Sequence, residues 1–295
     1  MNWIIPTLLA ALLSGISVIF IKKLLLHEHS LDFSVVLGLL LVIMSLPFIP
    51  FISRDVTLWQ YGLIFLEALC ASFGFWYVTK SIKRMEVSEV TAFLALGPLF
   101  TFILALIFLK ETLTPWQIGG ITLIAFGGYV LHVDHKTKSP LEPIKKFLHF
   151  KYFKYIMGFS LLYALDSIIN RYLVNTAGNQ ALDSATFFFW FHIFVAAIML
   201  VFYFFFKQRN TQGIIHTLTK NSHFLLIIVI LTFGYRLAEI IAISLPQGNI
   251  AMVIGIKRLG LLVPAIIAGE LFHEHHLFKR ITAFAIMVIG SLLLL

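Results

Sequence analysis

Long apolar runs, separated by short polar segments, dominate the hydrophobic pattern of this chain. Each run approaches the roughly 20 residues that an α-helix needs to cross a bilayer, whereas a transmembrane β-strand needs only about 10. The pattern therefore predicts ten membrane-spanning helices. They cover residues 3–21, 34–52, 58–78, 87–109, 116–133, 152–173, 185–206, 224–245, 250–269 and 277–295.

The composition supports a membrane protein and excludes two other classes. Of the 295 residues, 60% are hydrophobic and 12% are charged, whereas an average soluble domain is about 25% charged. A water-soluble fold of this length could not cover so much apolar surface. Intrinsic disorder requires the opposite composition, with low hydrophobicity and high charge. We therefore expect an all-α integral membrane protein.

One long polar linker, residues 134–151, divides the chain into two halves of five spans each, residues 1–133 and 152–295. The two halves share a sequence pattern in which a glutamate is followed sixteen residues later by a glycine in an apolar run. The pairs are Glu111 with Gly127 and Glu274 with Gly290. An odd number of spans per half predicts that the second copy is inverted relative to the first. Inverted repeats place a solute site near the membrane midplane, between the halves.

Three stretches of the first half resemble the second part of an EamA repeat. They are Leu94-Ala95-Leu96-Gly97-Pro98-Leu99-Phe100, Leu109-Lys110-Glu111-Thr112-Leu113-Thr114-Pro115-Trp116-Gln117 and the run from Gly119 to Leu131. In the second half, Lys257-Arg258-Leu259-Gly260-Leu261-Leu262, followed by Gly269, Phe272 and Glu274, is similar to the corresponding part of a second copy.

The resemblance implies a member of the drug/metabolite transporter superfamily with two tandem EamA repeats. Such a protein would be a ten-helix transporter of small metabolites, often an exporter, with a central cavity between its halves. The chain departs from the usual pattern in the ninth span, where the proline is displaced to Pro264. The resemblance does not identify the solute.

The net charge is +8, and most basic residues lie in loops that follow odd-numbered spans. Under the positive-inside rule these loops would be cytoplasmic and both termini external. The resemblance implies the reverse, because members of the family usually keep both termini inside, so orientation stays open. The multi-pass pattern favours the plasma membrane as the location.

Charged residues at membrane depth are the main functional candidates, because each costs at least a few kcal/mol there. Arg and Lys suit carboxylate or phosphate ligands, and residues four apart, such as Asp166 and Asn170, share one helix face. The alternative is internal pairing that only holds helices together. The candidate solute-binding residues are Lys22, Trp76, Asp166, Asn170, Tyr235, Arg236, Glu239, Lys257 and Arg258.

The charge balance of the second half favours a negatively charged solute. Four cations, Arg171, Arg236, Lys257 and Arg258, face two acids, Asp166 and Glu239, which leaves a surplus of two positive charges if Arg171 lies inside. Internal pairing of Arg236 with Glu239 is the competing hypothesis.

In the first half, Glu67 is the only acid deep in a span, and it is the candidate for proton coupling. Its alternative role is an internal partner for a lysine such as Lys22. Lys22 itself is either a pathway residue or an interfacial anchor. Glu111 and Glu274 are expected to be structural, as caps of the helices that follow them.

Two clusters of histidines suit a metal site by residue type alone, but their spacing fixes no ligand geometry, so we predict no metal and no cofactor. The clusters are His27 and His29 around Glu28, and His273, His275 and His276 around Glu274. We find no nucleotide-binding loop and no nucleophile motif, so the chain is not expected to be an enzyme.

The sequence favours a secondary transporter of a small polar metabolite, anionic or zwitterionic, that works by alternating access around a midplane cavity. One alternative is a proton-coupled exporter of lipophilic cations that uses Glu67. An alternative of another class is a non-transporting membrane protein or an intramembrane metal-dependent enzyme. The expected partners are a small-molecule solute and the lipid bilayer, with no nucleic acid and a homodimer as an open possibility.

Overall fold

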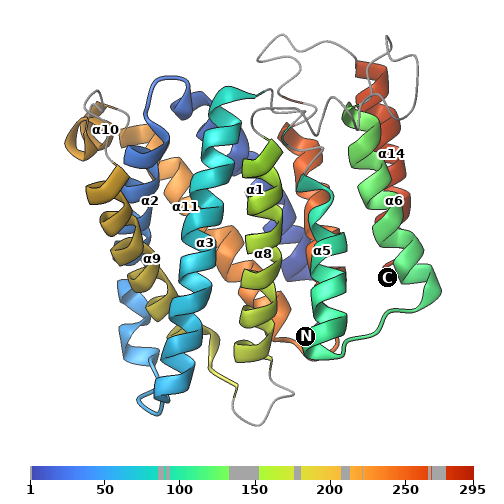
Figure 1. The fold of residues 1–295 in the computed structure, drawn as a ribbon, viewed down its shortest axis with the longest axis horizontal. Helices are drawn as coiled ribbons and strands as arrows, with labels where there is room; N and C mark the ends of the chain where they lie inside the picture. The colour runs from blue at the N-terminus through green and yellow to red at the C-terminus, as the bar shows by residue number, and fades with distance from the viewer. Residues whose placement is uncertain are drawn as a thin grey trace.

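The computed structural model describes residues 2–85, 90, 94–132, 153–175, 181–206, 213–220, 222–264, 267 and 277–295. Throughout these residues the regular structure is helical, which confirms the all-α class (Figure 1). Within the described residues, five helices are long and apolar enough to cross a membrane: Ile4–Leu25, Ser30–Phe51, Leu58–Arg84, Ser184–Phe206 and Ser222–Ser244. The linker 134–151 lies outside the described residues.

Each predicted span contains a helix. The helices are α1 (Ile4–Leu25), α2 (Ser30–Ser45) continued by the 3-10 helix η1 (Leu46–Phe51), α3 (Leu58–Arg84), α5 (Gly97–Leu104) continued by the π-helix η2 (Ala105–Leu109), α6 (Pro115–His132), α8 (Phe153–Val174), α9 (Ser184–Phe206), α11 (Ser222–Ser244), α12 (Ile250–Lys257) continued by the 3-10 helix η3 (Arg258–Leu261), and α14 (Leu277–Leu292). A short helix, α10 (Ile214–Lys220), was not predicted.

Local sequence explains several helix ends. Thr57 and Gln60 form a capping box that starts α3, because each side chain bonds the backbone N–H of the other residue. Pro50 lies inside η1, where its missing N–H and fixed φ disfavour a continuing α-helix. The helix of the fourth span is interrupted, since Ala95 and Leu96 form a turn before α5 begins at Gly97.

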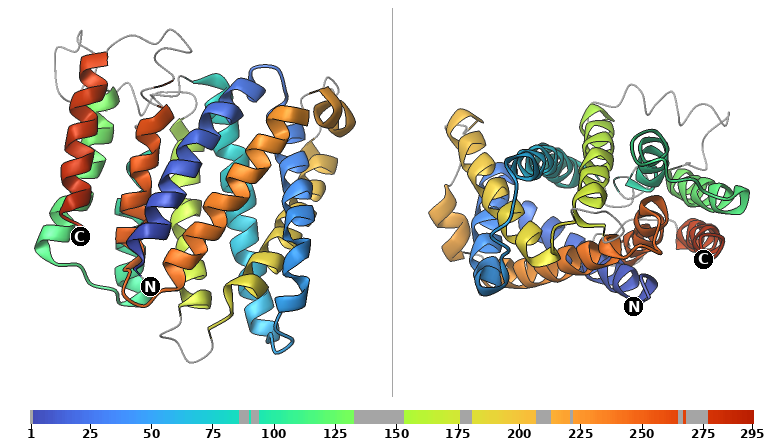
Figure 2. Two further views of the ribbon diagram at one scale, coloured as in Figure 1. Left: turned by 180° about the vertical axis from the view of Figure 1, so that it is seen from behind. Right: turned by 90° about the horizontal axis from the view of Figure 1, so that it is seen from below.

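The helices pack as a bundle in which the two halves are interleaved. Helix α1 packs against α11, α3 against α8, α2 against α9, and α6 against α14. The pair α6 and α14 forms one edge of the bundle, and α9 with α10 lies at the opposite edge (Figure 2). Both termini lie at the same end of the bundle, the lower end in Figure 1.

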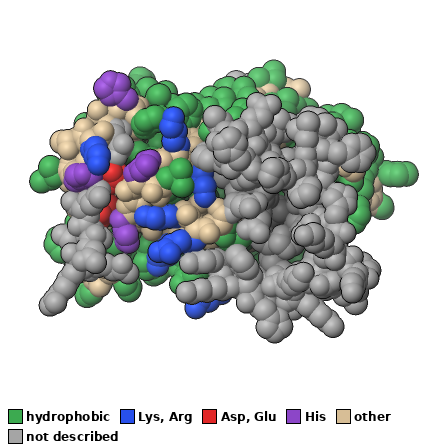
Figure 3. Space-filling view, turned by 90° about the horizontal axis from the view of Figure 1, so that it is seen from above, with side chains coloured by type: hydrophobic (Ala, Val, Ile, Leu, Met, Phe, Trp, Pro, Cys, Tyr) green, Lys and Arg blue, Asp and Glu red, His purple; other side chains and the backbone are tan. Residues whose placement is uncertain are grey.

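The opposite end, the upper end in Figure 1, is basic. Lysine, arginine and histidine side chains gather on this face (Figure 3). Lys23 after the first span, Arg84 at the end of α3 and Lys154 at the start of α8 are all exposed. These residues belong to the odd-numbered loops and their borders, so the charge asymmetry that the sequence predicts is also an asymmetry between the two ends of the folded bundle.

Two glycine pairs allow helix backbones to touch. A Cβ atom at Gly15 of α1 would lie 2.1 Å from the carbonyl oxygen of Gly260 in η3, and one at Gly260 would lie 2.0 Å from the carbonyl oxygen of Ala11. Gly120 of α6 and Gly290 of α14 meet in the same way, each close to the other's carbonyl oxygen. Small residues of this kind let membrane helices approach closely.

We predict that Gly15→Ala lowers the free energy of unfolding by about 1–3 kcal/mol, because the new methyl group must displace backbone rather than a flexible side chain. The measurement is chemical or thermal unfolding of the purified protein in detergent. Gly119→Ala on α6 is the matched control, since a Cβ there meets nothing within 4 Å. Equal stability of the two variants would contradict the predicted close packing.

Candidate functional site

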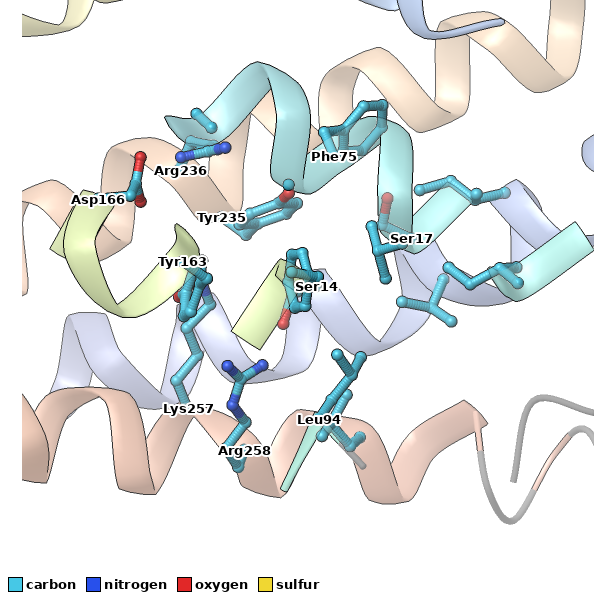
Figure 4. Close-up of a pocket in the computed structure, with 18 of the residues that line it drawn as sticks. Ser14, Ser17, Phe75, Leu94, Tyr163, Asp166, Tyr235, Arg236, Lys257 and Arg258 are labelled. Atoms are coloured by element: carbon cyan, nitrogen blue, oxygen red, sulfur yellow. The ribbon is translucent and has the colours of Figure 1, made fainter. Parts of the chain in front are cut away.

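A cavity of about 120 Å³ lies among α1, α3, α8, α11 and η3. Apolar side chains such as Phe75, Leu94 and Phe159 form much of its wall (Figure 4). The charged groups and tyrosines come from α8, α11 and the junction of α12 with η3, and Ser14 and Ser17 of α1 add hydroxyl groups. The cavity therefore has the usual form of a small-molecule site, with an apolar wall and a few convergent polar groups.

Lys257, the last residue of α12, is bound on two sides. Its ammonium group lies 2.5 Å from Glu239 Oε1 and donates a hydrogen bond of 3.0 Å to the Tyr163 hydroxyl. The Tyr163 hydroxyl in turn donates to Glu239 Oε1 at 2.5 Å. These three side chains join α8, α11 and α12 in one buried triangle. Glu239 thus pairs with Lys257 rather than with Arg236.

Arg258, the next residue, has no carboxylate partner among the described residues. Its side chain is 6% exposed, its guanidinium lies 4.8 Å from the Tyr163 ring centroid, and its Nε and one Nη atom have no hydrogen-bond partner in the part that the structure describes. The group lies over Gly97, where a Cβ would be 2.6 Å from Arg258 Nη2. Gly97 therefore makes room for it.

Asp166 and Arg236 form a second charged group in the cavity wall. The Arg236 guanidinium faces Asp166 (Figure 4) and also lies 5.1 Å from the Phe191 ring centroid. One carboxylate oxygen of Asp166, Oδ1, has no hydrogen-bond partner among the described residues. Tyr235 also lines the cavity, with the Lys257 ammonium 5.0 Å from the centroid of its ring.

Glu67 lies outside the cavity wall but close to this second group. It is fully buried in α3, and its electrostatic neighbours include Asp166 and Arg236. Neither carboxylate oxygen makes a hydrogen bond that meets standard geometry within the described part of the chain. Asn170, also buried and outside the cavity lining, is a neighbour of Glu67 on α8.

The structure changes the charge balance that the sequence suggests. Arg171 is bound to Glu111 at 2.8 Å and does not line the cavity, so it does not add to the surplus there. Three cations and three acids remain in and around the cavity wall when Glu67 is counted, so the formal surplus of positive charge disappears. The uneven feature is the pairing, because Arg258 lines the cavity and forms no ion pair with any described residue.

Two sequence candidates lie elsewhere. The Lys22 ammonium donates hydrogen bonds to the Ile82 and Met85 carbonyls at 2.6 and 2.7 Å, and so closes the C-terminal end of α3. Trp76 is outside the cavity lining, and the Lys80 ammonium lies 3.4 Å from the centroid of its ring. Neither residue contacts the cavity space.

The histidine clusters give no metal site in the part of the chain that the structure covers. No group of three or more His, Cys, Asp or Glu residues there is arranged to hold a metal ion. His273, His275, His276 and Glu274 lie outside the described residues.

Sequence reasoning missed Gly97, which admits Arg258, and Ser14, which lines the cavity. Gly97-Pro98 within an apolar run was the available signal for a helix interruption near a site. A serine in a membrane span gives no comparable signal, because hydroxyl groups often bond to their own helix, as Ser14 does to the Ala11 carbonyl.

Comparisons with known proteins agree with the fold and the pattern. Residues 1–133 match the model of the EamA-like transporter family. No curated protein matches the chain significantly. A solved structure, described only as the crystal structure of a protein, superimposes with a TM-score of 0.63 at 12% sequence identity and covers 96% of this chain and 97% of that one. At this identity it shows the fold alone.

We predict that Glu239→Gln lowers the free energy of unfolding by about 3–5 kcal/mol, because it leaves the Lys257 ammonium buried without a carboxylate. The double variant Glu239→Gln/Lys257→Met should lose less than the single one, since no unpaired charge remains. Thermal unfolding of the purified variants measures both. A double variant whose free energy of unfolding falls at least as far as that of Glu239→Gln alone would contradict the pairing.

Proposed function

Residues 1–133 match the model of the EamA-like transporter family, and from this match we propose that the chain carries a small anionic or zwitterionic metabolite across the membrane. The family match confirms the predicted resemblance for the first half of the chain, and the general class that the family implies is a multi-pass membrane transporter of the drug/metabolite superfamily. The solute, its charge, the mechanism and a plasma-membrane location are proposals.

The observation that carries the proposal is the state of Arg258. The Arg258 guanidinium is 6% exposed, and its Nε and Nη2 have no hydrogen-bond partner among the residues that the structure describes. A buried cation with unpartnered N–H groups is costly in a low-dielectric environment. A carboxylate or phosphate group is the natural complement, because it can accept two parallel hydrogen bonds from the guanidinium plane. The cavity beside Arg258 provides the space for such a group.

Lys257 has a different role in this proposal. Its ammonium is already bound to Glu239 and Tyr163, so it stabilises the wall of the cavity rather than the solute. A zwitterionic solute would have a second contact available at Asp166, where one carboxylate oxygen is unpartnered in the described structure. This supports amino acids as well as simple organic acids or phosphorylated compounds.

The packing supports two inverted repeats that move around this cavity. If each helix is replaced by the helix of the corresponding span in the other half, the pair α1–α11 becomes α8–α3, and the pair α5–α8 becomes α12–α1. All four pairs are in contact. The fourth span, which contains α5, and the ninth span, which contains α12, correspond in this exchange, and α5 packs against α12. Interrupted helices at corresponding positions of two halves are typical of transporter solute sites, and here they bring Gly97 to Arg258.

A second candidate function is proton-coupled export of lipophilic cations. The observation that favours it is Glu67, a fully buried carboxyl group without a hydrogen-bond partner of standard geometry among the described residues. A cation would need to reach this group, and Glu67 does not line the cavity. The anion hypothesis is preferred because Arg258 does.

We predict that carboxylate, phosphate or zwitterionic metabolites raise the thermal stability of the purified protein. A ligand at 100 times its Kd stabilises the folded state by roughly 2.7 kcal/mol when it binds only that state. Arg258→Gln should abolish the shift, because glutamine keeps hydrogen-bond donors but removes the charge and the fork. The measurement is a melting curve against a panel of anionic, zwitterionic and cationic compounds.

Arg54→Gln is the matched control, since Arg54 is an exposed arginine in the loop before α3. It should retain the shift in full. Stabilisation by lipophilic cations alone, lost in Glu67→Gln and kept in Arg258→Gln, would overturn the anion hypothesis and support the second candidate.

A further inference from the structure

The two ends of the bundle differ in how they close the space between the halves. The cavity residues lie in the second halves of α1 and α3 and in the first part of α8. The cavity therefore extends from the middle of the bundle toward the basic end, the upper end in Figure 1. At the opposite end, a set of hydrogen bonds centred on Arg171 and Glu111 joins the ends of α8 and α11 to the start of α12.

Arg171, in the last turn of α8, binds three acceptors. Its Nε donates to Glu111 Oε1 at 2.8 Å, and its Nη1 donates to the carbonyls of Ile243 and Leu245, at 2.5 and 2.8 Å. The other carboxylate oxygen of Glu111 accepts the backbone N–H of Ile250 at 2.9 Å. Arg171 and Glu111 therefore hold together α8, the end of α11 and the start of α12.

The chain conformation places Glu111 for this contact. Lys110 has a φ of 56° and ends η2 in a left-handed turn. A lysine is uncommon in this conformation, and the turn redirects the chain so that the next side chain, Glu111, reaches α8. Glu111 is thus more than a helix-start residue, which is the role that the sequence alone suggests.

The pair joins the two halves of the chain. Glu111 belongs to the first half, whereas Arg171 and all of its other partners belong to the second. Arg171 follows Asp166 of the cavity wall by five residues on the same helix, which is about 7.5 Å along the helix axis. The bonds therefore lie nearer the end of the termini than Asp166 does, where they join α8, α11 and α12, three helices that also carry cavity residues.

We propose that Arg171 and Glu111 form an inter-repeat lock that closes the solute pathway at the end where the termini lie. The lock must open for the halves to rock apart at that end. This inference rests on the proposed transport function, but its test does not require a solute. The Arg171 side chain is 4% exposed and the Glu111 side chain is 16% exposed, so the protein shields most of both groups.

The chain contains a built-in probe for this test. Cys70 is its only cysteine and it lines the cavity. In proteoliposomes of known orientation, a membrane-impermeant methanethiosulfonate reagent applied from one side reports whether Cys70 is reached from that side. In the unmodified protein we expect slow labelling from the side of the termini, because the lock closes that route.

Glu111→Gln should increase the labelling rate from the side of the termini by about tenfold or more, which corresponds to about 1.4 kcal/mol of lost preference for the closed state. Arg171→Lys keeps the charge but cannot bond the carboxylate and both carbonyls with one fork. It should give an intermediate rate, and it serves as the second variant if Glu111→Gln does not fold.

Thr186→Val is the matched control. The Thr186 hydroxyl accepts the backbone N–H of Ser53 at 2.7 Å, so it also joins the two halves, but at α9 and the segment after η1, away from the cavity. Its loss should leave the labelling rate unchanged. Lock variants that fold and still show wild-type labelling would overturn the lock and leave anion binding at Arg258 untouched. If the lock variants show increased labelling of Cys70 but no anion raises the thermal stability of the protein, the lock is supported and only the proposed solute class is overturned.

Discussion

A charged group inside a membrane must be bound to another polar group, and this constraint governs the centre of the molecule. Each buried cation of the second half illustrates one solution. Lys257 is bound to Glu239 and Tyr163, Arg236 faces Asp166, and Arg171 is bound to Glu111 and two carbonyls. Arg258 has no bonded acid in the described structure, and its Nε and Nη2 have no hydrogen-bond partner there. Under the proposed function, the partner that Arg258 lacks is an anionic group of the solute.

The same contacts divide the buried charges into three roles. The Lys257 triangle connects α8, α11 and α12 and stabilises the cavity wall. Arg258, lying over Gly97 at the paired helix interruptions, faces the space that a solute would occupy. Arg171 and Glu111 connect the halves nearer the end where the termini lie. Under the proposed function these three groups are a stable wall, a ligand group and a reversible closure. The first two lie at adjacent residues, 257 and 258, and the third lies at the start of α12, at Ile250.

Much of the fold was predictable because lipid imposes simple requirements on a sequence. Apolar runs of helical length identified a helix in every predicted span, and the buried charges identified four of the cavity residues: Asp166, Arg236, Lys257 and Arg258. The partners of these charges were not predictable, since spacing along a helix does not say which neighbouring helix it faces. One hypothesis paired Glu239 with Arg236, whereas its partner in the structure is Lys257. The charge count assigned Arg171 to the cavity, whereas its partner in the structure is Glu111. In both cases the partner lies on another segment of the chain. The short helix α10 was missed because seven residues give too little periodicity.

Binding of an anionic group of the solute at Arg258 is tested most directly by a structure of the purified protein determined with the metabolite that stabilises it most. We predict a carboxylate or phosphate group within hydrogen-bond distance of Arg258 Nε and Nη2, close to Gly97 and Tyr163. An anion bound away from Arg258, or a cationic ligand next to Glu67 with Arg258 unoccupied, would contradict this assignment.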